Sequence, residues 1–475
     1  MKSIAVEEKV DRLWLDNPWW EEGTAVIPFG DLEPRDYLSP FSALVMQHQP
    51  RRSVVLMGPR RVGKTVLIHH LIKQLIGTAG IPADNILYVS VDTPIYTGMP
   101  LDIFVNLLRD IANFHSDQPG YCFFDEIQYL KNWEIQLKSL VDTYPNFKFI
   151  VSGSAAAALR LKSTESGAGR FTDFLLPPLT FAEFLKFRAV EDELIEEIAS
   201  DTYAYKCTDI DRLNENFIDY INYGGYPETV FSEEIRANPA RFIKSDILDK
   251  VLLKDLPSLY GIRDIPELNR LFTTLAYNTG EEVSMGGLTQ SSGVNKETVR
   301  RYLDYLEAAF LIKRIRRIDK TGKHFQRDRQ FKVYLTNPSL RTALFGPVSA
   351  DHEDMGHLTE TAIFAQWFHN QYLTDNINYA RWKGGEVDFV GRIFSSPQMQ
   401  WAVEVKWSDR PYSHPDTVQG LIDFARVNNL EGMPKITTRT RTGQRTIRGT
   451  PIEFIPSSIY CYTIGKNMTR NPVAS

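Results

Sequence analysis

The most regular feature of the chain is the alternation of apolar runs with helical segments between residues 51 and about 185. Apolar runs lie at 53–57, 86–91, 121–124 and 147–152, and helical periodicity is found at 66–76 and 101–114. Short apolar runs that alternate with helices are typical of a parallel sheet covered on both faces. The pattern therefore predicts an α/β domain, preceded by an N-terminal extension with an amphipathic stretch at 37–49.

The rest of the chain has three different patterns. Residues 186–270 have helical periodicity and many acidic side chains, and residues 271–335 have the pattern of a small helical module followed by a basic hairpin. Beyond about 350 the pattern is mixed again, with a helix expected at 358–371 and short strands at 379–392 and 400–406. We expect several domains, because 475 residues exceed what one hydrophobic core supports.

Composition and charge narrow the functional classes. The formal net charge is −5, which argues against a uniformly basic nucleic-acid coat but allows local basic patches. The three cysteines, Cys122, Cys207 and Cys461, have no metal-ligand spacing, so we expect a reducing compartment without disulfides or a zinc site. No signal peptide and no membrane-length apolar run is present, so we expect a soluble, cytoplasmic protein without a membrane partner.

Residues 58–65, GPRRVGKT, fit the phosphate-binding loop G-x-x-x-x-G-K-[ST] between an expected strand and an expected helix. Glycines let backbone N–H groups close around phosphates, and the helix N-terminus adds partial positive charge. Lys64 is expected to reach the β- and γ-phosphates and Thr65 to hold Mg²⁺. A glycine turn with a surface lysine is the alternative, which the strand–loop–helix context disfavours. We predict ATP and Mg²⁺ as ligands, bound through Gly58, Arg61, Gly63, Lys64, Thr65 and Val66.

A second acidic element follows the apolar run 121–124. Asp125 and Glu126 come directly after it, about sixty residues beyond the loop. Asp125 is expected to hold Mg²⁺, and Glu126 to orient and activate the attacking water. An isolated acidic pair after a strand is more often a solvated turn, but its position after a complete phosphate-binding loop favours the catalytic interpretation. The adjacent Glu126 favours a hydrolase over a nucleotide switch or a small-molecule kinase.

Three further motifs extend the pattern. The run 147–151 ends in Ser152-Gly153-Ser154, and Gly169-Arg170 is followed by LTFAEFL at 179–185. With the phosphate-binding loop, these motifs resemble the AAA+ ATPases. The match is sharpest to the bacterial and archaeal AAA+ family whose members carry a C-terminal domain of unknown function with a nuclease-like fold.

The resemblance implies roles for three residues. Ser154 would sense the γ-phosphate, and Arg170 would be an arginine finger inserted into a neighbouring subunit, which implies a homo-oligomeric ring. The alternative for Arg170 is a surface arginine in a loop. Residues 224–228, GGYPE, resemble the lid motif of the family and would place Pro227 near the nucleotide. A plain helix terminator is the other interpretation of this Gly-Gly-x-Pro turn.

Residues 287–303 have the pattern of a helix, a glycine turn and a second helix capped by Asn295 or Lys296. The pattern resembles a winged helix-turn-helix with residues 323–333 as the wing. Residues 296–332 hold twelve Lys or Arg against five Asp or Glu, which favours DNA contact. A winged-helix lid that serves only subunit packing is an equal alternative.

The C-terminal part contains Glu360 at the beginning of the expected helix 358–371, Asp388 on an expected strand, and Glu404-Val405-Lys406 on the next strand. Side chains alternate along a strand, so Glu404 and Lys406 share a face that Asp388 can join. These residues resemble the PD-(D/E)XK nucleases, in which carboxylates bind Mg²⁺ and the lysine helps to position the attacking water. A degenerate nuclease fold that binds without cutting is the alternative.

Together, these patterns predict an α/β chain with five parts: an N-terminal extension or linker (1–50), an AAA+ ATPase core (51–185), a helical lid (186–270), a winged helix-turn-helix (271–345) and a PD-(D/E)XK nuclease-like domain (346–475). The expected function is hydrolysis of Mg-ATP by an oligomer that couples turnover to DNA binding or processing. The alternative is an ATP-dependent assembly switch whose nuclease-like domain does not cleave.

Overall fold

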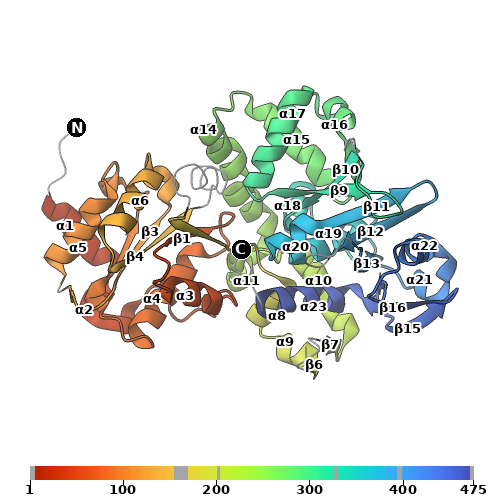
Figure 1. Ribbon diagram of the computed structural model, residues 1–475, viewed down its shortest axis with the longest axis horizontal. Helices are drawn as coiled ribbons and strands as arrows, with labels where there is room; N and C mark the ends of the chain where they lie inside the picture. Colours follow the sequence, from red (N-terminus) through yellow and green to blue (C-terminus); the bar gives the residue numbers. More distant parts are fainter. Residues whose placement is uncertain are drawn as a thin grey trace. The chain divides into compact units, whose positions relative to one another are not determined.

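The computed structural model describes residues 6–112, 114–153, 169–199, 204–325, 330–392 and 398–470. The chain divides into two compact units, a first unit (Met1–Leu176) and a second unit (Pro177–Val473) (Figure 1). The five domain boundaries expected from the sequence stay predictions.

The first unit is an α/β structure built on a five-stranded sheet in the order β2-β3-β4-β1-β5. All of its pairings are parallel, as the alternating pattern predicts. Figure 1 shows β1, β3 and β4 in this unit with helices on both sides of them. Its main elements are α1 (Val6–Asp16), α2 (Trp19–Glu22), α3 (Leu38–Met46), β1 (Ser53–Met57), α4 (Lys64–Gly77), β2 (Ile86–Ser90), α5 (Leu101–Ile111), β3 (Gly120–Asp125), α6 (Trp133–Thr143), β4 (Phe147–Gly153) and β5 (Phe171–Leu175).

Parallel register gathers the polar strand ends of this sheet at one edge. Met57, the last residue of β1, pairs with Gly153 of β4, and Asp125, the last residue of β3, pairs with Ser90 of β2. Strands β1 and β3 are fully buried because both sheet faces are covered. The loop after β1 and the carboxylate after β3 therefore emerge at the same edge, where ligands bind in open α/β sheets.

The N-terminal segment covers the exposed edge of strand β2. The side-chain amide of Asn17 donates to the Tyr88 carbonyl (2.9 Å) and accepts from the Tyr88 N–H (2.6 Å), so it pairs with the strand as another strand would. The indoles of Trp19 and Trp20 both donate to the Ile86 carbonyl. An unpaired edge strand favours unwanted pairing with other chains, and Asn17, Trp19 and Trp20 cover this edge.

The second unit is built on a nine-stranded mixed sheet in the order β15-β16-β14-β13-β12-β11-β9-β10-β8. The strands of this unit are β6 (Ile195–Ala199), β7 (Ala204–Cys207), β8 (Glu282–Ser284), β9 (Ile312–Ile318), β10 (Gln330–Leu335), β11 (Ile377–Trp382), β12 (Gly385–Gly391), β13 (Trp401–Glu404), β14 (Lys435–Thr438), β15 (Gly443–Ile447) and β16 (Thr450–Pro456). Of these, β6 and β7 form a separate two-stranded sheet. The main helices of the unit are α8 (Phe181–Phe187), α9 (Glu191–Leu194), α10 (Ile210–Tyr223), α11 (Pro227–Phe231), α12 (Glu233–Ala237), α13 (Pro239–Phe242), α14 (Leu256–Tyr260), α15 (Ile265–Tyr277), α16 (Met285–Ser292), α17 (Lys296–Ala308), α18 (Ser339–Phe345), α19 (Met355–Trp367), α20 (Gln371–Asn376), α21 (Arg410–Ser413), α22 (Gln419–Asn428) and α23 (Ser457–Arg470).

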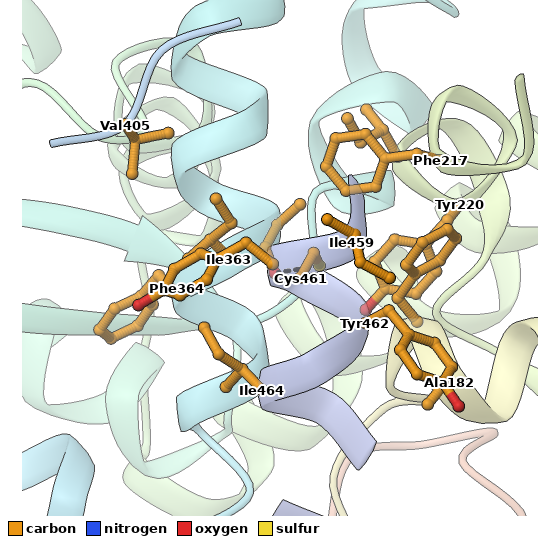
Figure 2. Close-up of a cluster of buried hydrophobic side chains, with 14 of the residues drawn as sticks. Ala182, Phe217, Tyr220, Ile363, Phe364, Val405, Ile459, Cys461, Tyr462 and Ile464 are labelled. Atoms are coloured by element: carbon orange, nitrogen blue, oxygen red, sulfur yellow. Dashed lines mark hydrogen bonds between the residues drawn. The ribbon is translucent and has the colours of Figure 1, made fainter. Parts of the chain in front are cut away.

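The last helix of the chain, α23, lies at the centre of the main core of the second unit. Its residues Ile459, Cys461 and Tyr462 pack among side chains of α19 and α10 (Figure 2). Helix α8 packs on the same helix, and the Cβ position of Gly465 lies 3.0 Å from Thr180. Helices from the beginning and the end of this unit therefore share one hydrophobic core, so the free energy of unfolding of the two regions is coupled.

Two features of the second unit differ from the sequence pattern. Residues 195–199 (β6) and 204–207 (β7) pair as antiparallel strands inside the stretch expected to be helical. The acidic run around Ile195 and Ile198 has helical spacing, but burial of Ile195 and Tyr205 against the core overrides that preference. In addition, β9 pairs in parallel with β11, so the hairpin β9–β10 and the C-terminal strands belong to one sheet.

Among the helices in the described parts of the chain, none is long and apolar enough to span a bilayer.

Candidate functional site

The loop after β1 has the backbone that phosphate binding requires. A Cβ on Gly58 would lie 2.2 Å from the Leu176 carbonyl oxygen, so only glycine fits there. Gly63 has a φ of 92°, in the left-handed region that glycine adopts without strain, and the next residue, Lys64, begins α4. The loop therefore leads directly into a helix N-terminus, where backbone N–H groups attract anions.

Two buried cations hold this loop. The Lys64 ammonium is 6% exposed and donates to the carbonyls of Gly58 (3.1 Å) and Pro59 (2.8 Å). The Arg35 guanidinium, which is also buried, donates to the Val62 carbonyl (2.9 Å) from the N-terminal segment. Arg35 was not expected from the sequence, because nothing in a linker-like stretch indicates contact with a loop 27 residues away. The two cations raise the positive potential where phosphates would bind.

Asp125 is the centre of a hydrogen-bond network at the end of β3. Its Oδ2 accepts from the Thr65 hydroxyl (2.6 Å) and the Tyr88 hydroxyl (3.0 Å). Its Oδ1 accepts from the Ser152 hydroxyl on β4. The structure thus joins Thr65 to Asp125, as the motif predicts, and adds Tyr88 and Ser152, which the sequence analysis missed. Their signal is positional, because both lie near the carboxyl ends of strands that flank β3.

Glu126 follows Asp125 in the left-handed backbone region, with a φ of 56°. A non-glycine residue in this region is uncommon and is often found at functional sites. Its carboxylate accepts a hydrogen bond from the Gln128 amide. Burial raises the pKa of Glu126, the nearby Asp125 raises it further, and the Lys64 ammonium opposes the rise. A carboxylate with a raised pKa is a better proton acceptor, which suits a general base.

These residues fit a magnesium nucleotide. The donor set consists of a threonine hydroxyl already in contact with an aspartate carboxylate, which is the oxygen-ligand chemistry that Mg²⁺ prefers. Thr65 and Asp125 would hold the ion, while Gly63, Lys64 and the first turn of α4 would hold the phosphates. When bound, Mg²⁺ supplies positive charge that screens the phosphate oxygens.

The remaining nucleotide-site predictions have different outcomes. Ser154 lies outside the described residues. The Arg170 guanidinium is half-exposed and donates through Nε to Asp142 Oδ1 on α6 (2.8 Å). Pro227 is the first residue of α11, and the Gly-Gly pair before it ends α10, so it occupies a helix start in the second unit. The roles expected for Arg170 and Pro227 stay predictions.

Comparison with known protein families agrees with this geometry. Residues 50–185 match the family model of an AAA domain. The match includes the phosphate-binding loop, Asp125 and Glu126, and it supports nucleotide-dependent activity in the AAA domain. Residues 214–351 match a second family model, described as a domain of unknown function (DUF8612). Neither family model is described as a nuclease, so the nuclease-like domain stays a prediction.

Three relatives match between 71% and 75% of this chain. A Haemophilus influenzae protein is 25% identical over 346 residues, which cover 71% of this chain and 79% of the relative. Two Methanocaldococcus jannaschii proteins are each 24% identical and cover 72% and 75% of this chain and equal shares of their own lengths. All three are named "Uncharacterized protein".

Solved structures with some similarity include the Aeropyrum pernix ORC2 protein in ADPNP–ADP complexes (TM-score 0.40, 13% identity, 67% of this chain and 93% of that chain). Another is C. elegans PCH-2 (TM-score 0.28, 13% identity, 50% of this chain and 66% of that chain). These scores are too low to support an argument, so the case for the AAA domain rests on the family match and the site.

Outside the AAA domain, the second unit brings together the four residues of the expected nuclease-like site. Lys406 Nζ lies 2.7 Å from Glu404 Oε1 and 3.6 Å from Asp388 Oδ2. Asp388 Oδ2 also accepts from the Val405 N–H (2.9 Å), which ties β12 to the end of β13. Glu360 faces them from the middle of α19, not from its start as the sequence suggested.

A fifth residue, Lys332 of β10, was missed by the sequence analysis. Its ammonium lies 2.8 Å from Glu360 Oε1, 3.1 Å from Glu386 Oε1 and 3.3 Å from Asp388 Oδ1. The Tyr334 hydroxyl, two residues further along the strand, donates to the same Glu360 oxygen. We call Lys332, Glu360, Asp388, Glu404 and Lys406 the lysine–carboxylate cluster. The sequence pattern predicts that Lys332 belongs to the basic wing, but strand periodicity places it on the inner face with Tyr334.

Burial and charge shift the pKa values of this cluster in opposite directions. Burial alone would raise the pKa of Asp388, but the ammoniums of Lys406 and Lys332 lower it below its ordinary value. Burial and the Asp388 carboxylate raise the pKa of Glu360, and they raise that of Glu404 to about 7. The buried Lys332 stays charged, because its carboxylate neighbours raise its pKa in spite of desolvation.

The lysine–carboxylate cluster does not fit a magnesium ion. An ammonium already contacts each expected carboxylate ligand, because Lys332 contacts Glu360 and Asp388 and Lys406 contacts Glu404. Among the described residues, no group of three or more His, Cys, Asp or Glu is arranged to hold a metal. The resemblance to PD-(D/E)XK nucleases therefore holds for the residue set, whereas the geometry differs from a metal centre.

Proposed function

We propose that this protein is an ATPase whose AAA domain hydrolyses Mg-ATP at the loop 58–65. The observation that carries the proposal is the contact between Thr65 and Asp125 (2.6 Å), followed immediately in the sequence by the half-buried Glu126. A nucleotide-binding loop alone would support binding only. A magnesium-ligand pair beside a carboxylate of raised pKa supports hydrolysis as well.

Each residue has one task in this reaction. Lys64 neutralises the phosphate oxygens, and Thr65 and Asp125 hold the metal ion in place. Tyr88 and Ser152 keep Asp125 oriented by hydrogen bonds to its two oxygens. Glu126 accepts the proton of the attacking water. Fixed charges of this kind stabilise the transition state because they need no reorganisation during the reaction.

We infer that the active form is a homo-oligomer in which Arg170 reaches the nucleotide of a neighbouring subunit. The Arg170–Asp142 ion pair supports this, because a half-exposed pair is weak and can be exchanged for a phosphate contact at little cost. A buried, multiply bonded arginine would be unsuited to the task. Ring assembly would then couple turnover in one subunit to the position of the next.

DNA is the partner that the second unit suits best. Helix α17 follows a glycine turn and is capped by Asn295, whose side chain accepts from the Thr298 N–H. Lys296 and Arg300 are exposed one helical turn apart, and Arg300 also lines a cavity of about 560 Å³. Other basic side chains of that cavity are Lys313, Arg314, Arg316 and Arg392. A basic helix face beside a basic cavity is an electrostatic surface for phosphates.

The second candidate function is an ATP-controlled assembly switch. It is favoured by the pairing of charges on the hairpin β9–β10. Arg314 contacts Asp304 and Glu307, and Lys313 contacts Asp375 (2.6 Å). Charges neutralised inside the protein attract DNA less. Within the basic stretch 296–332, ion pairs thus neutralise part of the positive charge of β9, and the exposed basic residues of α17 carry more weight for DNA binding.

Two measurements test these proposals. Lys64→Ala should abolish binding of a fluorescent ATP analogue, and undiminished binding would remove the loop as the nucleotide site. Arg300→Glu should weaken duplex DNA binding and flatten its salt dependence, because a phosphate contact releases counterions. Arg445→Glu, the same charge change on β15, is the matched control. If both variants bind DNA as the parent does, or if the parent binds no DNA, DNA contact through α17 is excluded and the assembly switch is the remaining function.

A further inference from the structure

We propose that Lys332 permanently occupies the cation position of the lysine–carboxylate cluster, so that this nuclease-like centre excludes divalent metal and does not cleave DNA. The proposal goes beyond the ATPase function and does not depend on it. It assigns to Lys332 the electrostatic role that a metal ion has in a working nuclease.

The first argument is the position of the ammonium. Its three carboxylate contacts lie between 2.8 and 3.3 Å and come from two elements, α19 and β12. The Lys332 side chain is 4% exposed, and its ammonium lies 5.5 Å from the centre of the Tyr379 ring. Because the Lys332 ammonium is both hydrogen-bonded and enclosed, it stays in the cluster, whereas a surface lysine would move freely.

The second argument is that oxygens of two of the carboxylates, Glu360 and Asp388, already have hydrogen-bond partners, whereas Oε2 of Glu404 has none among the described residues. Oε1 of Glu360 accepts from both Lys332 and Tyr334. Oδ1 of Asp388 faces Lys332, and its Oδ2 accepts from the Val405 N–H (2.9 Å). A metal ion would have to displace these donors from oxygens they hold.

The third argument is charge. Four carboxylates, those of Glu360, Glu386, Asp388 and Glu404, face the two ammoniums of Lys332 and Lys406. A divalent cation held by the same oxygens would lie beside both ammoniums and would be repelled by them in a poorly solvated site. Burial without compensation would be costly for the carboxylates, and Lys332 removes that cost without a metal. The ammonium and the metal are therefore mutually exclusive.

Manganese binding to nucleotide-free full-length protein, followed by electron paramagnetic resonance, tests the proposal. The parent should bind Mn²⁺ no better than Asp388→Asn, which lacks the central ligand. Lys332→Met should gain about one Mn²⁺ per chain, at least about a hundredfold tighter, because an adjacent positive charge is removed. Adding Asp388→Asn to this variant should abolish the gain. Lys313→Met removes a paired lysine of β9 outside the cluster and should gain none.

Two results would overturn the proposal. One is Mn²⁺ bound by the parent and lost in both Asp388→Asn and Glu404→Gln, together with Mn²⁺-dependent plasmid nicking that these variants lack. The other is a folded Lys332→Met protein that gains no Mn²⁺. If Lys332→Met does not fold, Lys332→Gln keeps a hydrogen-bond donor to Glu360 and must show the gain in its place. The comparison of the parent with Asp388→Asn needs no Lys332 variant and decides the matter if neither folds.

Discussion

Lys332→Met should destabilise the second unit strongly and locally. The substitution keeps most of the side-chain volume, so its effect is mainly the loss of charge. At the observed separations of 2.8 to 3.3 Å, each ion pair has a gross Coulomb energy of about 5 kcal/mol at an effective dielectric constant of about 20. Much of this is offset by desolvation, and breaking one partner of a buried pair costs about 3–5 kcal/mol in practice. Because Lys332 is 3% exposed, solvent screening does not reduce that range.

The loss should also depend on pH. Without Lys332, the carboxylates of Glu360 and Asp388 face each other and their pKa values rise in the folded state. A carboxylate whose folded-state pKa is raised contributes stability at low pH that is lost as the pH rises. The deficit of Lys332→Met relative to the parent should therefore be smaller at pH 5 than at pH 8. Adding Glu360→Gln should recover part of it, because one buried charge is removed.

Amide hydrogen exchange, measured for individual peptides, shows which elements lose stability in Lys332→Met. Amides of β10, α19 and β12 should exchange about a hundredfold faster or more in Lys332→Met, since 1.4 kcal/mol corresponds to about a factor of ten. Amides of β3 and β4 in the first unit are the internal control and should be unchanged. Acceleration below about fivefold, or equal acceleration in both units, would refute a buried ion network centred on Lys332.

The remaining predictions concern Glu404 and Arg170. The folded-state pKa of Glu404 is raised to about 7, above its ordinary value of 4.5, so its contribution to stability is present below about pH 4.5 and lost as the pH rises through 7. The free energy of unfolding of the parent, measured by urea titration, should therefore fall by up to about 3 kcal/mol between pH 5 and 8. In Glu404→Gln this dependence on pH should be lost. The same pH dependence in the parent and the variant would contradict the prediction. Arg170→Ala should impair hydrolysis only in the assembled protein, whereas Asp142→Asn breaks the same ion pair and should hydrolyse normally; equal loss in dilute monomer would exclude an arginine acting across subunits.

The AAA domain was predictable from the sequence because its signals are local. Residues 58–65 fix a loop between a strand and a helix, and the apolar run before Asp125 fixes a second strand end. In a parallel sheet the carboxyl ends of the strands lie at the same edge, so the loop and Asp125 come close together. The contact between Thr65 and Asp125 follows from these constraints, and the structure contains it.

The residues that were missed act over long sequence separations. Arg35 reaches the loop from the N-terminal segment, and Tyr88 reaches Asp125 from the neighbouring strand. Lys332 belongs to a run of basic residues that favours a solvent-exposed wing. Lys332 lies on β10, which pairs with β9, and β9 in turn pairs with β11. This long-range pairing brings Lys332 close to the acidic residues, and no local sequence pattern predicts it. Strands β6 and β7 were missed for a related reason. Their sequence has helical spacing, but burial of Ile195 and Tyr205 in the core favours strands there.

Hydrolysis by Glu126 is the central claim, and one pair of measurements on Glu126→Gln tests it most directly. The variant keeps the side-chain shape and removes the proton acceptor, while Lys64, Thr65 and Asp125 remain. The fluorescent ATP analogue should bind with the affinity of the parent, and steady-state phosphate release should fall by about a hundredfold or more, the range of one general base. Phosphate release at the rate of the parent, with binding intact, would show that Glu126 is not the base and would contradict the account.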